Sequence, residues 1–137
     1  MSRSGYVDDW DFDGGEWAMI RGRGAVTSAF RGKRGQTFLK EMLAALDALP
    51  EKKLVANDLQ AEDGAVCAIG AVGKARGLDM SKLDPEDPDT VAAKFGIATA
   101  MAREIVYEND EAGFHSETPE RRFERIRKWI ASEIKSL

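Results

Sequence analysis

The sequence has a single cysteine, Cys67, and a single histidine, His115, among its 137 residues. One cysteine excludes an internal disulfide, which is typical of proteins from a reducing compartment. A tetrahedral zinc site needs several Cys or His ligands, and the chain has only these two. We therefore expect a cytoplasmic protein with no bound metal and no cofactor.

Long apolar runs are absent as well. No stretch of 18 apolar residues occurs that would span a membrane, and the segment from Met1 to Tyr6 lacks the apolar region of a secretory signal. The hydrophobic fraction of 43% is ordinary for a globular protein. We expect one compact domain over residues 16–137, preceded by an acidic N-terminal arm over residues 1–15 that has no sustained periodicity.

Apolar residues recur at helical spacing through most of the chain, which predicts a mainly α fold of about five helices. Asp87-Pro88 and Thr118-Pro119 are typical of an N-cap followed by proline at the first helical position. The predicted helices cover about 16–30, 36–49, 64–76, 88–107 and 119–137. A short β-hairpin near 59–69, with Asp63-Gly64 as its turn, is the alternative to a helix that starts near Gly64. The predicted shared core contains Leu43, Leu46, Phe95, Ile105, Ile126 and Ile130.

Charge is segregated along the chain. Residues 1–16 contain five carboxylates and one cation, whereas residues 17–40 contain six cations and no carboxylate. Residues 41–118 contain sixteen carboxylates and seven cations, and residues 119–137 contain three carboxylates and six cations. Segregated charge creates a surface field that steers partners, so the pattern favours binding over catalysis.

The basic block is the candidate binding site. Gly32-Lys33-Arg34-Gly35 predicts a turn that, with Arg31, presents three cations to a partner. The full set of candidate partner-binding residues is Arg21, Arg23, Arg31, Lys33 and Arg34. An acidic protein surface is the expected partner, and a nucleic acid that contacts the block at 21–40 is the alternative. A second basic strip on the last helix contains Arg121, Arg122, Arg125 and Lys128.

Three catalytic or ligand-binding patterns are incomplete. A catalytic thiol needs a base beside it, and Cys67 and His115 are the one thiol and the one imidazole of the chain. The apolar neighbours of Cys67, however, are typical of an inert buried cysteine. Asp9, Asp11 and Asp13 match the first half of a calcium loop, yet Ile20 stands where the bidentate Glu is required. The glycines around Lys33 lack the spacing of a phosphate-binding loop. An enzyme of unknown type therefore remains only an alternative function.

The segments 23–50, 66–77 and 95–110 together resemble a group of small uncharacterised proteins of tailed phages and prophages. The resemblance covers most of the chain and implies a viral origin, but no residue role. We therefore expect a noncatalytic phage-encoded accessory protein, located in the cytoplasm of the host bacterium. Its expected partner is another protein, such as a host or defence component.

Overall fold

The structure, a computed structural model, describes residues 15–113 and 116–135, with side chains described from residue 23 onward. This part of the chain folds into six α-helices and one isolated antiparallel β-bridge, so the mainly α prediction is confirmed. The helices are α1 (Gly15–Arg31), α2 (Lys33–Asp47), α3 (Ala68–Arg76), α4 (Pro88–Phe95), α5 (Thr99–Asp110) and α6 (Pro119–Glu133). The predicted acidic arm lies outside the described residues.

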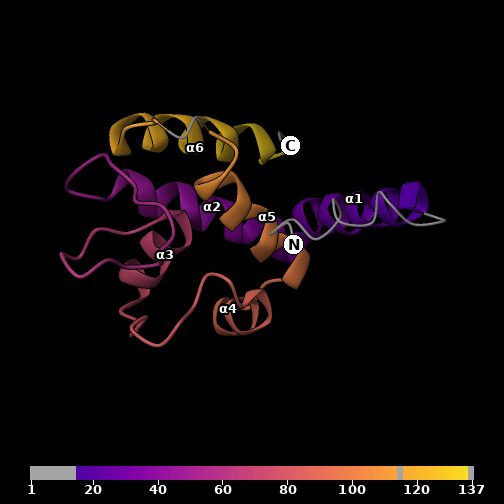
Figure 1. Cartoon of the computed structure of the whole chain (residues 1–137), viewed down its shortest axis with the longest axis horizontal. Coiled ribbons are helices and arrows are strands. Elements are labelled where there is room, and N and C mark those ends of the chain that lie inside the picture. The colour runs from indigo at the N-terminus through magenta and orange to yellow at the C-terminus, as the bar shows by residue number, and fades with distance from the viewer. Residues whose placement is uncertain (1–14, 114–115, 136–137) are drawn as a thin grey trace.

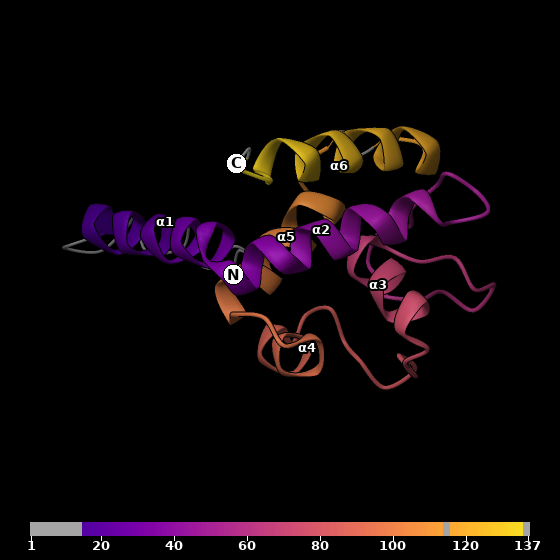
Figure 2. The same ribbon diagram turned by 180° about the vertical axis from the view of Figure 1, so that it is seen from behind.

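The helix α2 lies in the middle of the molecule, between α6 on one side and α3 on the other (Figure 1). The helix α5 contacts α3, α4 and α6, and the C-terminal part of α1 packs against α2 and α5. Seen from behind, the rest of α1 extends along the long axis beyond the other helices (Figure 2). The molecule is therefore a compact helical body with one projecting helix.

The core is formed by the apolar faces of α2, α3, α4, α5 and α6. Leu46, Ile105, Ile126 and Ile130 are fully buried, and Phe95 is 2% exposed, as the stripe spacing predicted. Leu43 is only partly buried at the edge of this cluster. Edge-to-face contacts extend the packing, with ring centroids 6.2 Å apart in the pair Phe38–Phe95.

The long helix predicted over 88–107 is wrong, because the chain breaks at Gly96. Gly96 has φ of +72°, and its N–H and that of Ile97 both donate to the carbonyl of Ala92. Glycine adopts this left-handed conformation without the steric cost that other residues pay. The break turns α5 away from α4 while Phe95 and Ile97 both stay buried.

The segment between α2 and α3 combines parts of both predicted alternatives. A single bridge joins Gln60 to Val66, and Gly64 has φ of +89° in the turn between them. The following helix begins at Ala68, because Cys67 is its N-cap and accepts a hydrogen bond from the N–H of Gly70. Neither a full hairpin nor a helix from Gly64 forms.

Candidate functional site

The predicted turn 32–35 is wrong, because α2 already begins at Lys33 and only Gly32 separates it from α1. Gly32 has an extended backbone with φ −66° and ψ 162°. Gly35 is buried against α1, where a Cβ would overlap with the carbonyl oxygen of Ala29. Glycine at position 35 thus allows the two helices to meet almost end to end. Arg31, Lys33 and Arg34 consequently lie on helix ends and not in a loop, whereas Arg21 and Arg23 belong to the middle of α1.

Lys33 and Arg34 lie in the first turn of α2, which contains no acidic residue and has no side-chain cap at Gly32. The N-terminus of a helix is its positive end, so cations at this position are unfavourable for the helix. The backbone N–H groups of this first turn carry a partial positive charge, which has the same sign as the charges of Lys33 and Arg34. Together they make this helix end attractive to an anionic group.

The C-terminal end of α6 is fixed at the same place. The side-chain amide of Gln36 donates to the carbonyl oxygens of Phe30 and Glu133, at 2.7 Å and 3.0 Å. The ammonium group of Lys135 donates to the carbonyl oxygen of Arg31 at 2.7 Å. Lys135 is therefore a fourth cation beside Arg31, Lys33 and Arg34, the three that adjoin Gly32. We call the set of Arg31, Lys33, Arg34 and Lys135 the basic junction.

The side chains of the basic junction are exposed. Within the part of the chain that the structure describes, Arg31, Lys33 and Arg34 form no ion pair and no side-chain hydrogen bond. The same holds for Arg23 and Lys40, which are also exposed. Arg21 belongs to α1, but its side chain lies outside the described residues. That these residues bind a partner stays a prediction.

Several cations elsewhere are paired with carboxylates of the same chain. Arg76 donates to both carboxylate oxygens of Glu41, at 2.6 Å and 2.7 Å, and its guanidinium lies 5.8 Å from the ring centre of Phe38. The hydrogen bond from Arg76 lowers the pKa of Glu41 below its usual value. Arg127 forms a similar pair with Asp47. The basic junction therefore differs from these sites in having charge without a matching carboxylate among the described residues.

Two of the four residues of the second basic strip, on α6, form ion pairs. Arg125 contacts Glu117 at 2.7 Å and Glu108 at 3.9 Å, and Arg122 contacts Glu117 at 3.4 Å. The Glu117 side chain is only 7% exposed, and the hydrogen bond from Arg125 lowers its pKa. Burial raises the pKa of Glu108. Only Arg121 and Lys128 of the predicted strip remain exposed for a partner.

Cys67 is buried as predicted. Burial raises the pKa of its thiol to about 12, so the thiol stays protonated and unreactive at neutral pH. His115, the other half of the incomplete thiol–imidazole pattern, and the acids of the incomplete calcium pattern lie outside the described residues. Groups of three or more side chains suited to metal binding are absent among the residues that the structure describes.

Asn109 is the one polar residue in the described core, and the sequence patterns did not predict it. Its side chain accepts from the N–H of Ala68 at 3.1 Å and donates to the carbonyl of Val55 at 2.9 Å. These bonds attach α5 to the start of α3 and to the preceding segment, so Asn109 has a structural role. Hydrophobic periodicity contains no signal for a buried amide.

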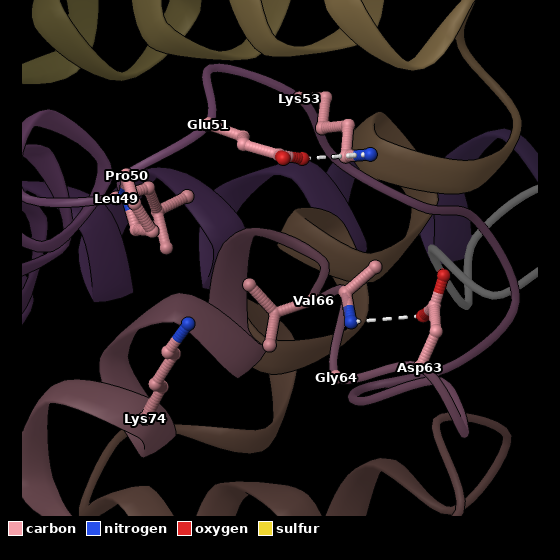
Figure 3. Close-up of a pocket in the computed structure, with 9 residues that line it drawn as sticks. Leu49, Pro50, Glu51, Lys53, Asp63, Gly64, Val66 and Lys74 are labelled. Carbon is pink, nitrogen blue, oxygen red and sulfur yellow. Dashed lines mark hydrogen bonds and ion pairs between the residues drawn. The ribbon is translucent and has the colours of Figure 1, made fainter.

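A hollow of about 270 Å³ lies between the end of α2, the turn at Asp63–Gly64 and α3 (Figure 3). Lys53 on its rim is paired with Glu51 at 2.8 Å, and this contact raises the pKa of Lys53. Lys74 extends from α3 toward the hollow (Figure 3). Asp63 accepts from the N–H of Ala65 at 3.0 Å. Glu51 and Lys53 pair with each other, and Asp63 accepts from the backbone, so Lys74 is the charged group of the lining without a side-chain partner among the described residues.

Comparison with known proteins adds no assignment. No family model matches the chain, and neither a curated protein nor a solved structure is significantly similar to it. No helix in the described part of the chain is long and apolar enough to cross a membrane.

Proposed function

We propose that the protein is a noncatalytic binding protein, and that the basic junction contacts an acidic surface of another protein. The observation that supports this function is the group of exposed cations at the meeting point of three helix ends. Arg31, Lys33 and Arg34 lack a matching carboxylate among the described residues. The resemblance to tailed-phage proteins supports a role as a phage-encoded accessory protein. A host or defence component is the partner that we favour.

The charge of the whole molecule favours a protein partner over a nucleic acid. The chain has a net charge of −4. Arg122 and Arg125 already bind Glu117, so only Arg121 and Lys128 of the basic strip on α6 are exposed. A nucleic-acid surface typically neutralises a longer row of phosphates, whereas the junction offers four cations. An acidic patch on a protein is the smaller target that fits it.

Fluorescence anisotropy with a poly-glutamate peptide and a short DNA duplex tests this proposal. The change Arg31→Ala, Lys33→Ala and Arg34→Ala removes three junction charges. We expect it to weaken peptide binding about tenfold at low salt, since exposed charge pairs contribute roughly 0.2–1 kcal/mol each. Wild-type binding to the peptide should weaken modestly as salt rises. A DNA contact would instead give a log–log salt slope of about −3 to −4.

The matched control is the change Lys74→Ala, Lys82→Ala and Lys94→Ala, which removes the same charge from exposed positions on or near α3 and α4. If only net charge matters, this control should bind the peptide as weakly as the junction variant does. Equal binding by the two variants would therefore contradict the proposal. Tight binding to the duplex with the steep slope would favour the nucleic-acid alternative.

A further inference from the structure

One side chain at the basic junction bonds to the ends of two other helices. The C-terminal end of α6 lies beside the place where α1 and α2 meet (Figures 1 and 2). Gln36, near the start of α2, donates one hydrogen bond to the carbonyl of Phe30 in α1 and another to that of Glu133 in α6. Its side-chain oxygen accepts a third bond, from the N–H of Lys135 at 2.8 Å. Gln36 therefore attaches the ends of α1 and α6 to the start of α2.

The backbone groups that Gln36 contacts are ones that a helix cannot satisfy internally. Carbonyl groups in the last turn of a helix have no donor from a following turn, and Phe30 and Glu133 lie in the last turns of α1 and α6. After Glu133 the chain leaves the helix, because Ile134 has an extended backbone with ψ of 124°. A glutamine amide supplies the two donors and the acceptor that this arrangement requires.

Lys135 is held at its backbone and at the tip of its side chain. Its N–H donates to Gln36, and its ammonium group donates to the carbonyl of Arg31 at 2.7 Å. The four-carbon stem of an exposed lysine is flexible, so its charge usually samples many positions in solvent. The position of the fourth cation of the basic junction therefore depends on an uncharged residue of another helix.

We propose that Gln36 is a positioning residue of the basic junction, which holds Lys135 beside the other three cations so that a partner meets four charges at fixed places. This inference rests on the proposed function and deepens it. A preorganised group binds more tightly than a mobile one, because its ordering cost has been met before the partner arrives. Loss of the Gln36 amide should therefore weaken binding although every cation remains in the chain.

A double-mutant cycle with Gln36→Met and Lys135→Ala, followed by fluorescence anisotropy with poly-glutamate, tests this role. Methionine is about as long as glutamine but has no N–H to donate. Each single change should weaken binding about threefold at low salt, the size expected for one exposed charge contact. The double variant should bind no more weakly than either single variant, because Lys135 contributes little once it is no longer held.

Two controls separate positioning from a general loss of structure. Lys33→Ala should weaken binding by the same factor in the wild type and in the Gln36→Met variant, because Lys33 lies on α2 itself. A general loosening would instead reduce the effects of Lys33 and Lys135 alike. Thr37→Val removes one side-chain hydrogen bond that stays within α2, to the carbonyl of Lys33, and should leave binding unchanged.

Hydrogen exchange of the Lys135 N–H, followed by NMR without any ligand, tests the geometry itself. In the wild type this N–H should exchange at least about tenfold more slowly than in an unfolded chain, and Gln36→Met should remove the protection. The amides of the buried residues Leu39 and Leu46 should stay protected in the variant, because Ile134 still packs against the core and the fold is retained.

The inference is overturned if Lys135→Ala has the same effect in the wild type and in the Gln36→Met variant. An unprotected Lys135 N–H in the wild type also overturns it, whether or not the variants fold. The proposed function fails by a different result, which is unchanged poly-glutamate binding after the change of Arg31, Lys33 and Arg34 to Ala. If that triple variant binds weakly while Gln36→Met binds as the wild type does, only the positioning role is refuted.

Discussion

Two glycines show how a single residue determines where the helices can pack. Gly35 is buried at a position where a Cβ would overlap with the Ala29 carbonyl, whereas a Cβ at Gly24 would have open space. We expect Gly35→Ala to lower the free energy of unfolding by about 2 kcal/mol or more, because the backbone of α1 must move. Gly24→Ala should instead raise it by up to about 1 kcal/mol, through helix propensity.

Urea denaturation followed by circular dichroism measures both changes at a protein concentration where the chain is monomeric. The pair Gly35→Ala and Gly24→Ala is matched, because each adds one methyl group within the same two-helix unit. Equal effects of the two substitutions would mean that α1 does not pack on α2 as described.

At the same scale, Cys67 tests the description of the core. Its thiol is buried and its pKa is raised to about 12, so the reactive thiolate is nearly absent at neutral pH. A thiol reagent should label the native protein at least about a hundred times more slowly than the urea-unfolded protein. Rapid labelling of the native protein would show that Cys67 is accessible and would reopen a chemical role for it.

Among the elements, the start of α6 depends on the contact between Glu117 and two arginines. The hydrogen bond from Arg125 lowers the pKa of Glu117 below its ordinary value of 4.5, so the folded state favours the carboxylate. The resulting stabilisation is present above about pH 4.5 and is lost as the pH falls through the lowered folded-state pKa. Glu117→Gln removes the negative charge and should cost about 2 kcal/mol near neutral pH.

Urea melts of the wild type and Glu117→Gln between about pH 6 and pH 3 measure this contribution. The difference between the two free energies of unfolding should shrink as the pH falls below 4.5, the ordinary pKa of the carboxyl group. The difference also separates Glu117 from Glu108, whose raised pKa acts in the opposite direction. A difference that stays constant over this range would mean that the Glu117 charge does not stabilise the fold.

Helix starts could be predicted from the sequence where a local signal exists. Asp87 and Thr118 cap α4 and α6 through their side chains, as their position before proline indicated. The break at Gly96 could not be predicted in the same way, because apolar residues continue at helical spacing across it. Whether a glycine stays helical or turns left-handed depends on the packing of Phe95 and Ile97 in the core.

The candidate site was only partly predictable for a similar reason. The sequence shows that the cations from Arg21 to Lys40 are grouped, but pairing depends on contacts between distant residues. Arg127 pairs with Asp47, 80 positions away, and Arg76 pairs with Glu41, 35 positions away. No local sequence pattern predicts such pairs, so the exposed junction and the partly paired strip on α6 cannot be distinguished from the sequence alone.

At the scale of the whole molecule, a compact body places one group of exposed cations at the point where α1, α2 and α6 end together. The negative net charge of the chain limits nonspecific attraction to other polyanions. The cations at the junction create a local field of the opposite sign. Electrostatic complementarity of this kind mainly raises the association rate with a chosen partner.

The most direct test of this account is the association rate constant with the protein that copurifies with the chain from cells that express it, measured by surface plasmon resonance. We expect the change of Arg31, Lys33 and Arg34 to Ala to slow association about tenfold at low salt. The change of Lys74, Lys82 and Lys94 to Ala should slow it far less. If the junction variant associates as fast and binds as tightly as the wild type, the basic junction is not the binding surface.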